Sequence, residues 1–330
     1  MSEFFRVLMK ILRPAVGVLL LIALFYFGLI DIAELRRALA HPIMLVAATI
    51  VCAAVMPVAG LRWHLFLRSQ GLVLRLSDTV RIVTMSFFFA TFLPGGAGGD
   101  IVRGVYIYDA SHGRRTGALL SIFIDRLIGL FAFMLVGVLA TLSRPWQSFG
   151  LFEYGVFLLA IAFLISIGVL FKFGHRIAGV VNLLFRGRSR RLAEIIDAAG
   201  TALHQYGKEW RSVILCLLLS IVIVFLLAAG VVMIAETMQF GSLSVVEYGI
   251  AGIYAMIANV VPVSPGGLGI GEGAFASACI ALEPTMSGVP YGTIFLVFRC
   301  VSVISSLPGL IVYLIYPHRA KLLTVVNPPS

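Results

Sequence analysis

The chain is dominated by long apolar segments with almost no charged residues, and these segments constrain the fold more than any other feature. A helix needs about 20 consecutive apolar residues to cross a hydrocarbon core about 30 Å thick. Hydrophobic residues make up 60% of the 330 residues and charged residues only 12%, and the mean hydropathy is +1.05. These values lie outside the range of soluble domains, so the sequence predicts an integral membrane protein.

Six of these segments are predicted to span the membrane as helices. They cover residues 14–30, 43–61, 117–142, 151–173, 211–234 and 291–316. The alternation of apolar and polar residues that is typical of membrane strands is absent from them. We therefore expect an all-α polytopic membrane protein that forms a single transmembrane domain over residues 1–330.

Basic residues are concentrated in short loops between the apolar segments, and they predict the topology. The formal net charge is +10, but the basic residues do not form one soluble face, so no nucleic-acid partner is expected. Cytoplasmic loops of membrane proteins are enriched in lysine and arginine, and six spans with the basic loops inside place both termini in the cytoplasm. The most basic loop, residues 174–210, repeats apolar residues at helical spacing and is predicted to be an amphipathic cytoplasmic linker.

Two shorter apolar stretches do not fit as spans, and each runs into a glycine-rich motif. Residues 80–91 lead into PGGAGGD, and residues 245–259 lead into VPVSPGGLGIGEG. Irregular backbone at membrane depth is tolerated only where it is buried in protein or lines a watery cavity. We therefore predict two re-entrant helical hairpins, at residues 80–110 and 243–283.

The two motifs form an internal repeat. Each contains Pro-Gly-Gly, a further glycine, and an acid six or seven residues beyond the proline. Each is also followed by an arginine about 32 to 34 residues beyond that proline. The first repeat is predicted to cover residues 43–142 and the second residues 211–316. Because three spans separate the motifs, we expect the two repeats to have opposite orientations in the membrane, as in transporters built from inverted repeats.

The motifs and the charges near them form the candidate site. An unpaired charge at membrane depth costs about 2.5 to 3.5 kcal/mol, so these charges must pair or face a cavity. The arginines could hold an anionic group such as a lipid phosphate, because guanidinium forks match phosphate oxygens. Alternatively, Asp100 and Glu272 only cap their half-helices, and Arg126 and Arg299 only neutralise them across the interface between the repeats. The candidate substrate-binding residues are Pro94, Gly95, Gly96, Gly98, Gly99, Asp100, Arg103, Asp125, Arg126, Pro265, Gly266, Gly267, Gly269, Glu272 and Arg299.

Other polar or helix-breaking residues in the apolar segments have simpler interpretations. Arg62 and Trp63 follow the second span and are interpreted as interfacial anchors. Asn259 is interpreted as a capping or turn residue, and Pro308 as a kink in the last span. The four cysteines form no CxxC pair and the six histidines are scattered, so neither a metal site nor another cofactor is expected.

Three stretches of the sequence resemble one known family. FLPGGAGGDIVRGVYI, SIFIDRLIGL and VPVSPGGLGIGEGAF are similar to the lysylphosphatidylglycerol synthase transmembrane, or flippase-like, family, which includes the membrane portion of the bacterial multiple-peptide-resistance factor. With the pattern of spans, the resemblance covers about residues 10–316. The matching motifs imply a substrate-binding role for residues 94–100 with Arg103, for Asp125 with Arg126, and for residues 265–272. The assignment of Arg299 to the site depends on the repeat alignment instead.

The resemblance implies a protein of the bacterial inner membrane that moves anionic or aminoacylated phospholipids, or related polyprenyl carriers, between leaflets. The soluble domain of the resistance factor has no counterpart here, so no synthase activity is expected. We therefore predict a lipid translocase, either a flippase or a scramblase, with phospholipid or another anionic lipid as its partner.

Two alternatives to a translocase remain open from the residues alone. One is a membrane-embedded enzyme that uses Asp100, Asp125 or Glu272 on a lipid-linked substrate, although no nucleophile with its own base is evident. The other is an ion-coupled transporter of small solutes. GGAGGD lacks the Gly-Lys-Ser/Thr ending of a nucleotide-binding loop. Small residues such as Gly129 and Gly137 would allow packing within the chain or between copies in a homo-oligomer.

Overall fold

The structure of the protein is a computed structural model. It describes most of the chain between residues 32 and 316. The described residues are 26, 32–72, 74–91, 96–110, 115–143, parts of 154–169, 209–238, 240–260, 264, 267–286 and 288–316.

Within these ranges the secondary structure is helical, without strands, and this confirms the predicted all-α class. The helices are α2 (Ile32–Leu39), α3 (Pro42–Ala53), α4 (Val55–Ser69), α5 (Leu76–Ala90), α6 (Ala97–Ala110), α7 (Arg115–Leu142), α10 (Trp210–Met238), α11 (Val245–Ala258), α12 (Ile270–Leu282) and α13 (Gly292–Ile315), with a 3-10 turn at Pro284–Met286.

Four helical stretches in the described part of the chain are long and apolar enough to cross a membrane. They are Pro42–Ser69, Gly117–Leu142, Trp210–Met238 and Gly292–Ile315. These stretches correspond to four of the six predicted spans, so a polytopic helical membrane protein is confirmed. Of the remaining predictions, the span at 14–30 and the linker at 174–210 lie almost wholly outside the described residues, and the span at 151–173 lies partly outside them.

The second predicted span is longer than the sequence indicated. It was expected to end at residue 61, but α3 and α4 follow each other and reach Ser69. The junction residue Ala54 has helical dihedral angles, with φ −61° and ψ −17°. Arg62 therefore lies inside a helix, and it is only 8% exposed. Its interpretation as an interfacial anchor is wrong, because an anchor at the membrane surface would be exposed.

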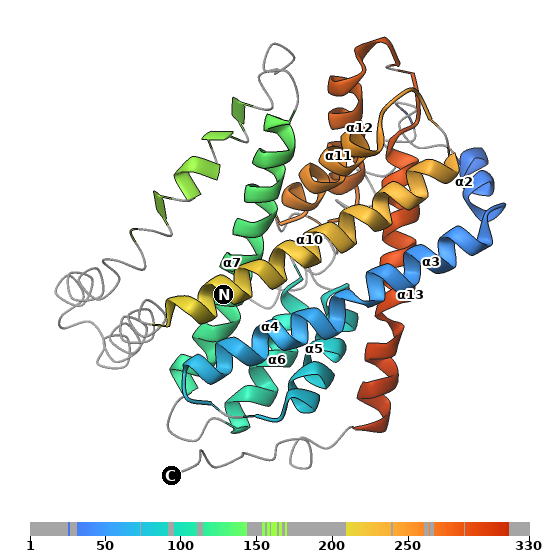
Figure 1. Ribbon diagram of the computed structural model, residues 1–330. Coiled ribbons are helices and arrows are strands. Elements are labelled where there is room, and N and C mark those ends of the chain that lie inside the picture. Colours follow the sequence, from blue (N-terminus) through green and yellow to red (C-terminus); the bar gives the residue numbers. More distant parts are fainter. Residues whose placement is uncertain are drawn as a thin grey trace, which may run out of the picture.

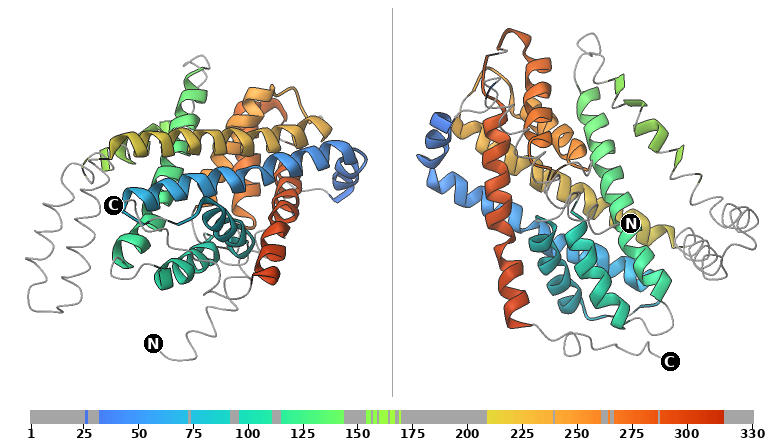
Figure 2. Two further views of the ribbon diagram at one scale, coloured as in Figure 1. Left: turned by 60° about the horizontal axis from the view of Figure 1, so that its bottom comes forward. Right: turned by 180° about the vertical axis from the view of Figure 1, so that it is seen from behind.

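Helix α10 lies beside α3 and α4 along their length, as both Figure 1 and Figure 2 show. The two stretches are antiparallel. Gly230, near the end of α10, faces Cys52 of α3, whereas Ser220, nearer its start, contacts Arg62 of α4. Helix α10 also contacts α7, α11 and α13, so it connects the parts of the fold that carry the two motifs.

Two helical pairs carry the glycine-rich motifs. Helices α5 and α6 pack together and are joined by the first motif loop, and α11 and α12 pack together and are joined by the second. The first pair also packs against α13, where Gly309 faces the carbonyl oxygen of Thr84. A side chain at Gly309 would meet that backbone, so this glycine permits the close approach of α13 to α5. Pro308 lies within α13.

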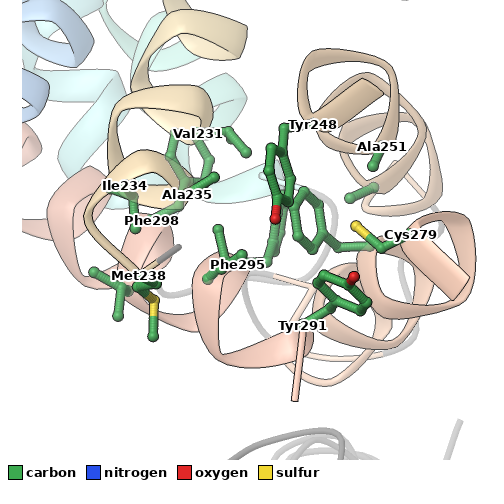
Figure 3. Packing of buried hydrophobic residues seen from close by; sticks show 14 of the residues in the cluster. Val231, Ile234, Ala235, Met238, Tyr248, Ala251, Cys279, Tyr291, Phe295 and Phe298 are labelled. Atoms are coloured by element: carbon green, nitrogen blue, oxygen red, sulfur yellow. The ribbon is translucent and has the colours of Figure 1, made fainter. Parts of the chain in front are cut away.

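The largest apolar core lies among α10, α11, α12 and α13. Figure 3 shows the aromatic rings of Tyr248, Phe295 and Tyr291 between α10 and Cys279 of α12. Phe295 stacks on Phe275, with ring centroids 5.7 Å apart. This packing fixes α12 against α13, and it therefore sets the position of the second motif relative to Arg299.

A hydrogen-bonded carboxylate joins the loops at the far end of this core. Glu283 accepts hydrogen bonds from the Ser242 amide (3.1 Å), the Ser242 hydroxyl and the Tyr291 hydroxyl (3.0 Å). The hydrogen bond from the Ser242 hydroxyl is the main reason why the pKa of Glu283 lies below its ordinary value. The contact links the α10–α11 loop to the start of α13.

We expect Gly99→Ala to destabilise the protein, because an added Cβ would lie 2.6 Å from the carbonyl oxygen of Ser86 and would separate α5 from α6. Overpacking of this kind costs about 1–3 kcal/mol. Gly104→Ala on the same helix is the control, since its nearest neighbour would lie at 3.6 Å. The measurement is the thermal unfolding midpoint in detergent. Equal midpoints for the two variants would contradict the close packing at Gly99.

Candidate functional site

The first motif loop is held by Arg126 of α7. Its Nε lies 2.5 Å from Oδ2 of Asp100, and its Nη2 donates to the carbonyl oxygen of Gly96 at 2.8 Å. Gly96 has φ +70°, a conformation that favours glycine because it has no Cβ. Asp100 lies in the first turn of α6, where a carboxylate is favoured by the helix dipole.

The second motif loop is held in the same way by Arg299 of α13. Its Nε lies 2.5 Å from Oε1 of Glu272, and its Nη2 donates to the carbonyl oxygen of Gly267 at 3.0 Å. Gly267 and Gly269 have φ +75° and +82°. Glu272 also accepts a hydrogen bond from the Gly269 amide at 2.8 Å, so it caps α12 as well as pairing with the arginine.

The two loops are therefore anchored at equivalent positions. In each, the arginine binds the motif acid and the carbonyl of the second glycine in Pro-Gly-Gly. The pairs differ in exposure: the side chains of Arg126 and Asp100 are 42% and 32% exposed, but those of Arg299 and Glu272 are only 16% and 0% exposed. The first pair is accessible to a ligand, whereas the second is largely closed.

The glycines of the motifs have different roles. Gly98 and Gly99 lie inside the first turn of α6, so they are helix residues, and Gly99 serves close packing. The positive-φ positions within the described parts of the motifs are Gly96, Gly267 and Gly269. The remaining predicted loop residues, Pro94, Gly95, Pro265 and Gly266, lie outside the described residues.

Asp125 is the centre of a separate, buried charge cluster. It is 2% exposed, and its two carboxylate oxygens accept hydrogen bonds from Nε and Nη2 of Arg62 at 2.7 and 3.0 Å. Oδ2 also accepts from Nη1 of Arg103 at 2.8 Å. Ser220 accepts from Arg62 at 2.9 Å, and Ser86 accepts from Arg103 at 3.0 Å. Asp125 and its neighbour Arg126 therefore bind different partners, although they are adjacent on one helix.

Sequence reasoning missed Arg62 as part of this site. The predicted span ended one residue before it, so Arg62 looked like an anchor at the membrane surface. The signal that could have identified it is the apolar sequence that continues beyond it as LFL. Gly129 of α7 leaves space for its guanidinium, because a Cβ there would lie 3.3 Å from Nη1.

The charge cluster and the first motif loop line one cavity of about 430 Å³. Its walls also include apolar residues of α4, α7 and α10. Among the described residues, three guanidinium groups and two carboxylates line it, which leaves one positive charge in excess. The charged residues lining this first cavity are Arg62, Arg103, Arg126, Asp100 and Asp125.

A second cavity, of about 360 Å³, adjoins the first beside α5. It shares Phe87, Ala90 and Gly96 with the first cavity, and it is also lined by Thr91, by residues of α13, and by Asn259 and Leu268 of the second motif region. The two motif regions therefore meet at these cavities. Among the described residues, no three His, Cys, Asp or Glu side chains are grouped in a way that could hold a metal ion.

These features define a helical, multi-pass membrane protein with a charged internal cavity. A family model described as the lysylphosphatidylglycerol synthase TM region matches residues 11–309. The chain therefore belongs to this family, as its motifs predicted. Comparisons with curated proteins and with solved structures gave no match.

We expect Asp125→Asn to destabilise the protein strongly, because it removes the carboxylate that neutralises two buried arginines. Breaking a buried ion pair by removing one partner costs about 3–5 kcal/mol. Ser220→Ala is the control, since it removes two hydrogen bonds, from Arg62 and to the Cys216 carbonyl, but no charge, at a cost of about 0.5–1.5 kcal/mol for each bond. Denaturant-induced unfolding in mixed micelles measures both. A smaller loss of stability for Asp125→Asn than for Ser220→Ala would contradict the central role of this carboxylate.

Proposed function

We propose that this protein is a lipid translocase that moves an anionic phospholipid between the two leaflets of a membrane. The observation that carries this proposal is the excess positive charge of the first cavity, where three arginines face two carboxylates. A phosphodiester carries one negative charge, so one bound head group would neutralise the cavity. The family match, to a membrane region named for a lipid, is consistent with a lipid-related function.

The arginines are suited to take up and release such a phosphate. Arg62 and Arg103 already share a single carboxylate, Asp125, and guanidinium groups readily bind a second oxyanion in a bidentate manner. Arg126 is the most exposed of the three and pairs with the partly exposed Asp100. In our proposal, Arg126 makes the first contact with the head group, and its ion pair with Asp100 forms again when the lipid leaves.

The inverted repeat is part of the same proposal. The equivalent anchoring of the two motif loops supports a twofold relation between residues 43–142 and 211–316, with hairpins at 80–110 and 243–283 that enter from opposite sides. Rocking of one repeat against the other would open the cavities alternately, while the acyl chains stay in lipid. An ion gradient or the lipid gradient itself would supply the energy.

We also propose that both termini face the cytoplasm and that the membrane is the bacterial inner membrane. One end of the helical bundle carries Arg68 at the end of α4, Arg75 at the N-cap of α5, and Arg211 at the start of α10. The opposite end carries Glu236, Glu247 and Glu283. The positive-inside rule assigns the arginine-rich end to the cytoplasm.

The test is translocation of fluorescent phosphatidylglycerol and of aminoacylated phosphatidylglycerol in proteoliposomes. We expect the intact protein to move at least one of these lipids. Arg126→Ala should lower the rate by about 10- to 100-fold, because a charge-assisted hydrogen bond is worth about 1.5–3 kcal/mol. Asp100→Asn should also lower the rate, because the added excess of positive charge slows release of the phosphate.

Arg81→Ala is the matched control for this assay. Arg81 pairs with Asp78 and lies over the ring of Tyr316, outside both cavities, so its removal should leave the rate unchanged. All variants are compared at equal insertion and equal thermal stability. If the intact protein moves neither lipid, or if Arg126→Ala and Asp100→Asn move lipid as well as Arg81→Ala does, the proposal is wrong.

A further inference from the structure

Arg62 and Arg103 both bind Asp125, but they use their guanidinium nitrogens differently. Arg62 donates from all three nitrogens, Nε and Nη2 to Asp125 and Nη1 to Ser220. Arg103 donates from Nε to Ser86 and from Nη1 to Asp125, and among the described residues its Nη2 has no hydrogen-bond partner. Arg103 therefore keeps one NH2 group that is not bound by the described part of the protein.

This NH2 group of Arg103 faces the first cavity. Arg103 lines that cavity. Among the described residues, the one fully buried side-chain nitrogen or oxygen without a partner is Oδ1 of Asn259, so Nη2 of Arg103, which also has no partner, is not fully buried. Asp125 accepts two hydrogen bonds from Arg62 but only one from Arg103. The excess positive charge of the cavity therefore lies nearest to Arg103.

The guanidinium of Arg103 lies over the indole ring of Trp63 on α4. The distance from Cζ of Arg103 to the ring centroid is 5.5 Å. A guanidinium in this position is attracted by the negative face of the ring, and the attraction is stronger when both groups are shielded from water. Trp63 is 0% exposed and Arg103 is 7% exposed. Trp63 is therefore not the interfacial anchor that its sequence position indicated.

A hydrogen bond fixes the orientation of the indole ring. Nε1 of Trp63 donates to the hydroxyl of Ser121 on α7 at 3.2 Å. This hydroxyl is buried and donates its own proton to the carbonyl oxygen of Ala118 at 2.6 Å, so it acts as the acceptor for the indole. Trp63 is not among the described residues that line the first cavity. It can therefore influence a ligand there only through Arg103.

We propose that Trp63 is a positioning residue, which holds Nη2 of Arg103 toward the first cavity so that it donates to a phosphate oxygen. Ser86 and Asp125 fix the other two nitrogens, but a plane that is held at two points still turns about the line between them. The indole ring supplies the third point and so sets the position of Nη2. This inference rests on the proposed function for its ligand, an anionic phosphodiester.

The experiment measures binding, so that it does not depend on translocation. Short-chain phosphatidylglycerol is titrated into the full-length protein in detergent, and its affinity is determined by isothermal titration calorimetry. Trp63→Leu should weaken binding about five- to tenfold, because an aliphatic side chain offers no aromatic face to the guanidinium. Trp63→Phe keeps an aromatic face and should stay within about threefold of the intact protein.

A double-mutant cycle separates positioning from core packing. In an Arg103→Gln background, Trp63→Leu should change the affinity by less than about twofold, because the group that it positions is gone. Leu67→Ala is the matched control, since Leu67 is fully buried on the same helix and in the same apolar core but does not line the cavity. It should keep the affinity of the intact protein. Trp63→Met, which fills more of the space, replaces Trp63→Leu if that variant does not fold.

The outcomes separate this inference from the proposed function. If Trp63→Leu binds the lipid as tightly as Leu67→Ala does, or weakens binding equally with and without Arg103, the ring only packs the core and the inference is wrong. It is also wrong if the intact protein binds no phosphatidylglycerol. If the cycle gives the expected result but the intact protein translocates no lipid, the positioning role of Trp63 stands and the translocase proposal fails.

Discussion

The arrangement of the first half of the molecule depends on one buried carboxylate, Asp125. It accepts hydrogen bonds from Arg62 on α4 and Arg103 on α6, and Arg62 also donates a hydrogen bond to Ser220 on α10. Each of these charges would cost about 2.5–3.5 kcal/mol at membrane depth if it were unpaired. With Ser86 of α5, which accepts from Arg103, the cluster joins five helices, and it leaves one guanidinium charge without a carboxylate of its own.

The hydrogen bonds of the two motif loops meet a second constraint that the bilayer imposes. A non-helical loop at membrane depth must satisfy its backbone carbonyls within the protein. In each loop one arginine does this, binding the motif acid and the carbonyl of the second motif glycine. The solution is the same in both halves, yet only the first pair is accessible.

Much of this arrangement could be predicted from local sequence. Asp100 and Glu272 follow their glycines at the start of a helix, and Arg126 and Arg299 lie at equivalent distances from the motif prolines, so their equivalent positions follow from the repeat. Pairing across the interface between the repeats was wrong, because each arginine binds the acid of its own repeat. The partner of Asp125 could not be found in this way. Arg62 precedes Asp125 by 63 positions, and its neighbours suggested a helix end at the membrane surface. Asn259 is the C-cap of α11, as its interpretation as a cap predicted, but local sequence could not show that Gly267 of the motif loop and Gly271 of α12 enclose its side chain.

The sequence by itself determined that this protein is a helical membrane protein of its family, because apolar segments of spanning length and contiguous motifs depend only on neighbouring residues. It also determined that most of the acids and arginines of the site lie within apolar surroundings, with Arg62 as the exception. Only the tertiary structure decided how those charges are paired, and therefore where a positive charge is left over. Pairing depends on which helices pack together, and helix packing brings residues more than 150 positions apart, such as Arg62 and Ser220, into contact.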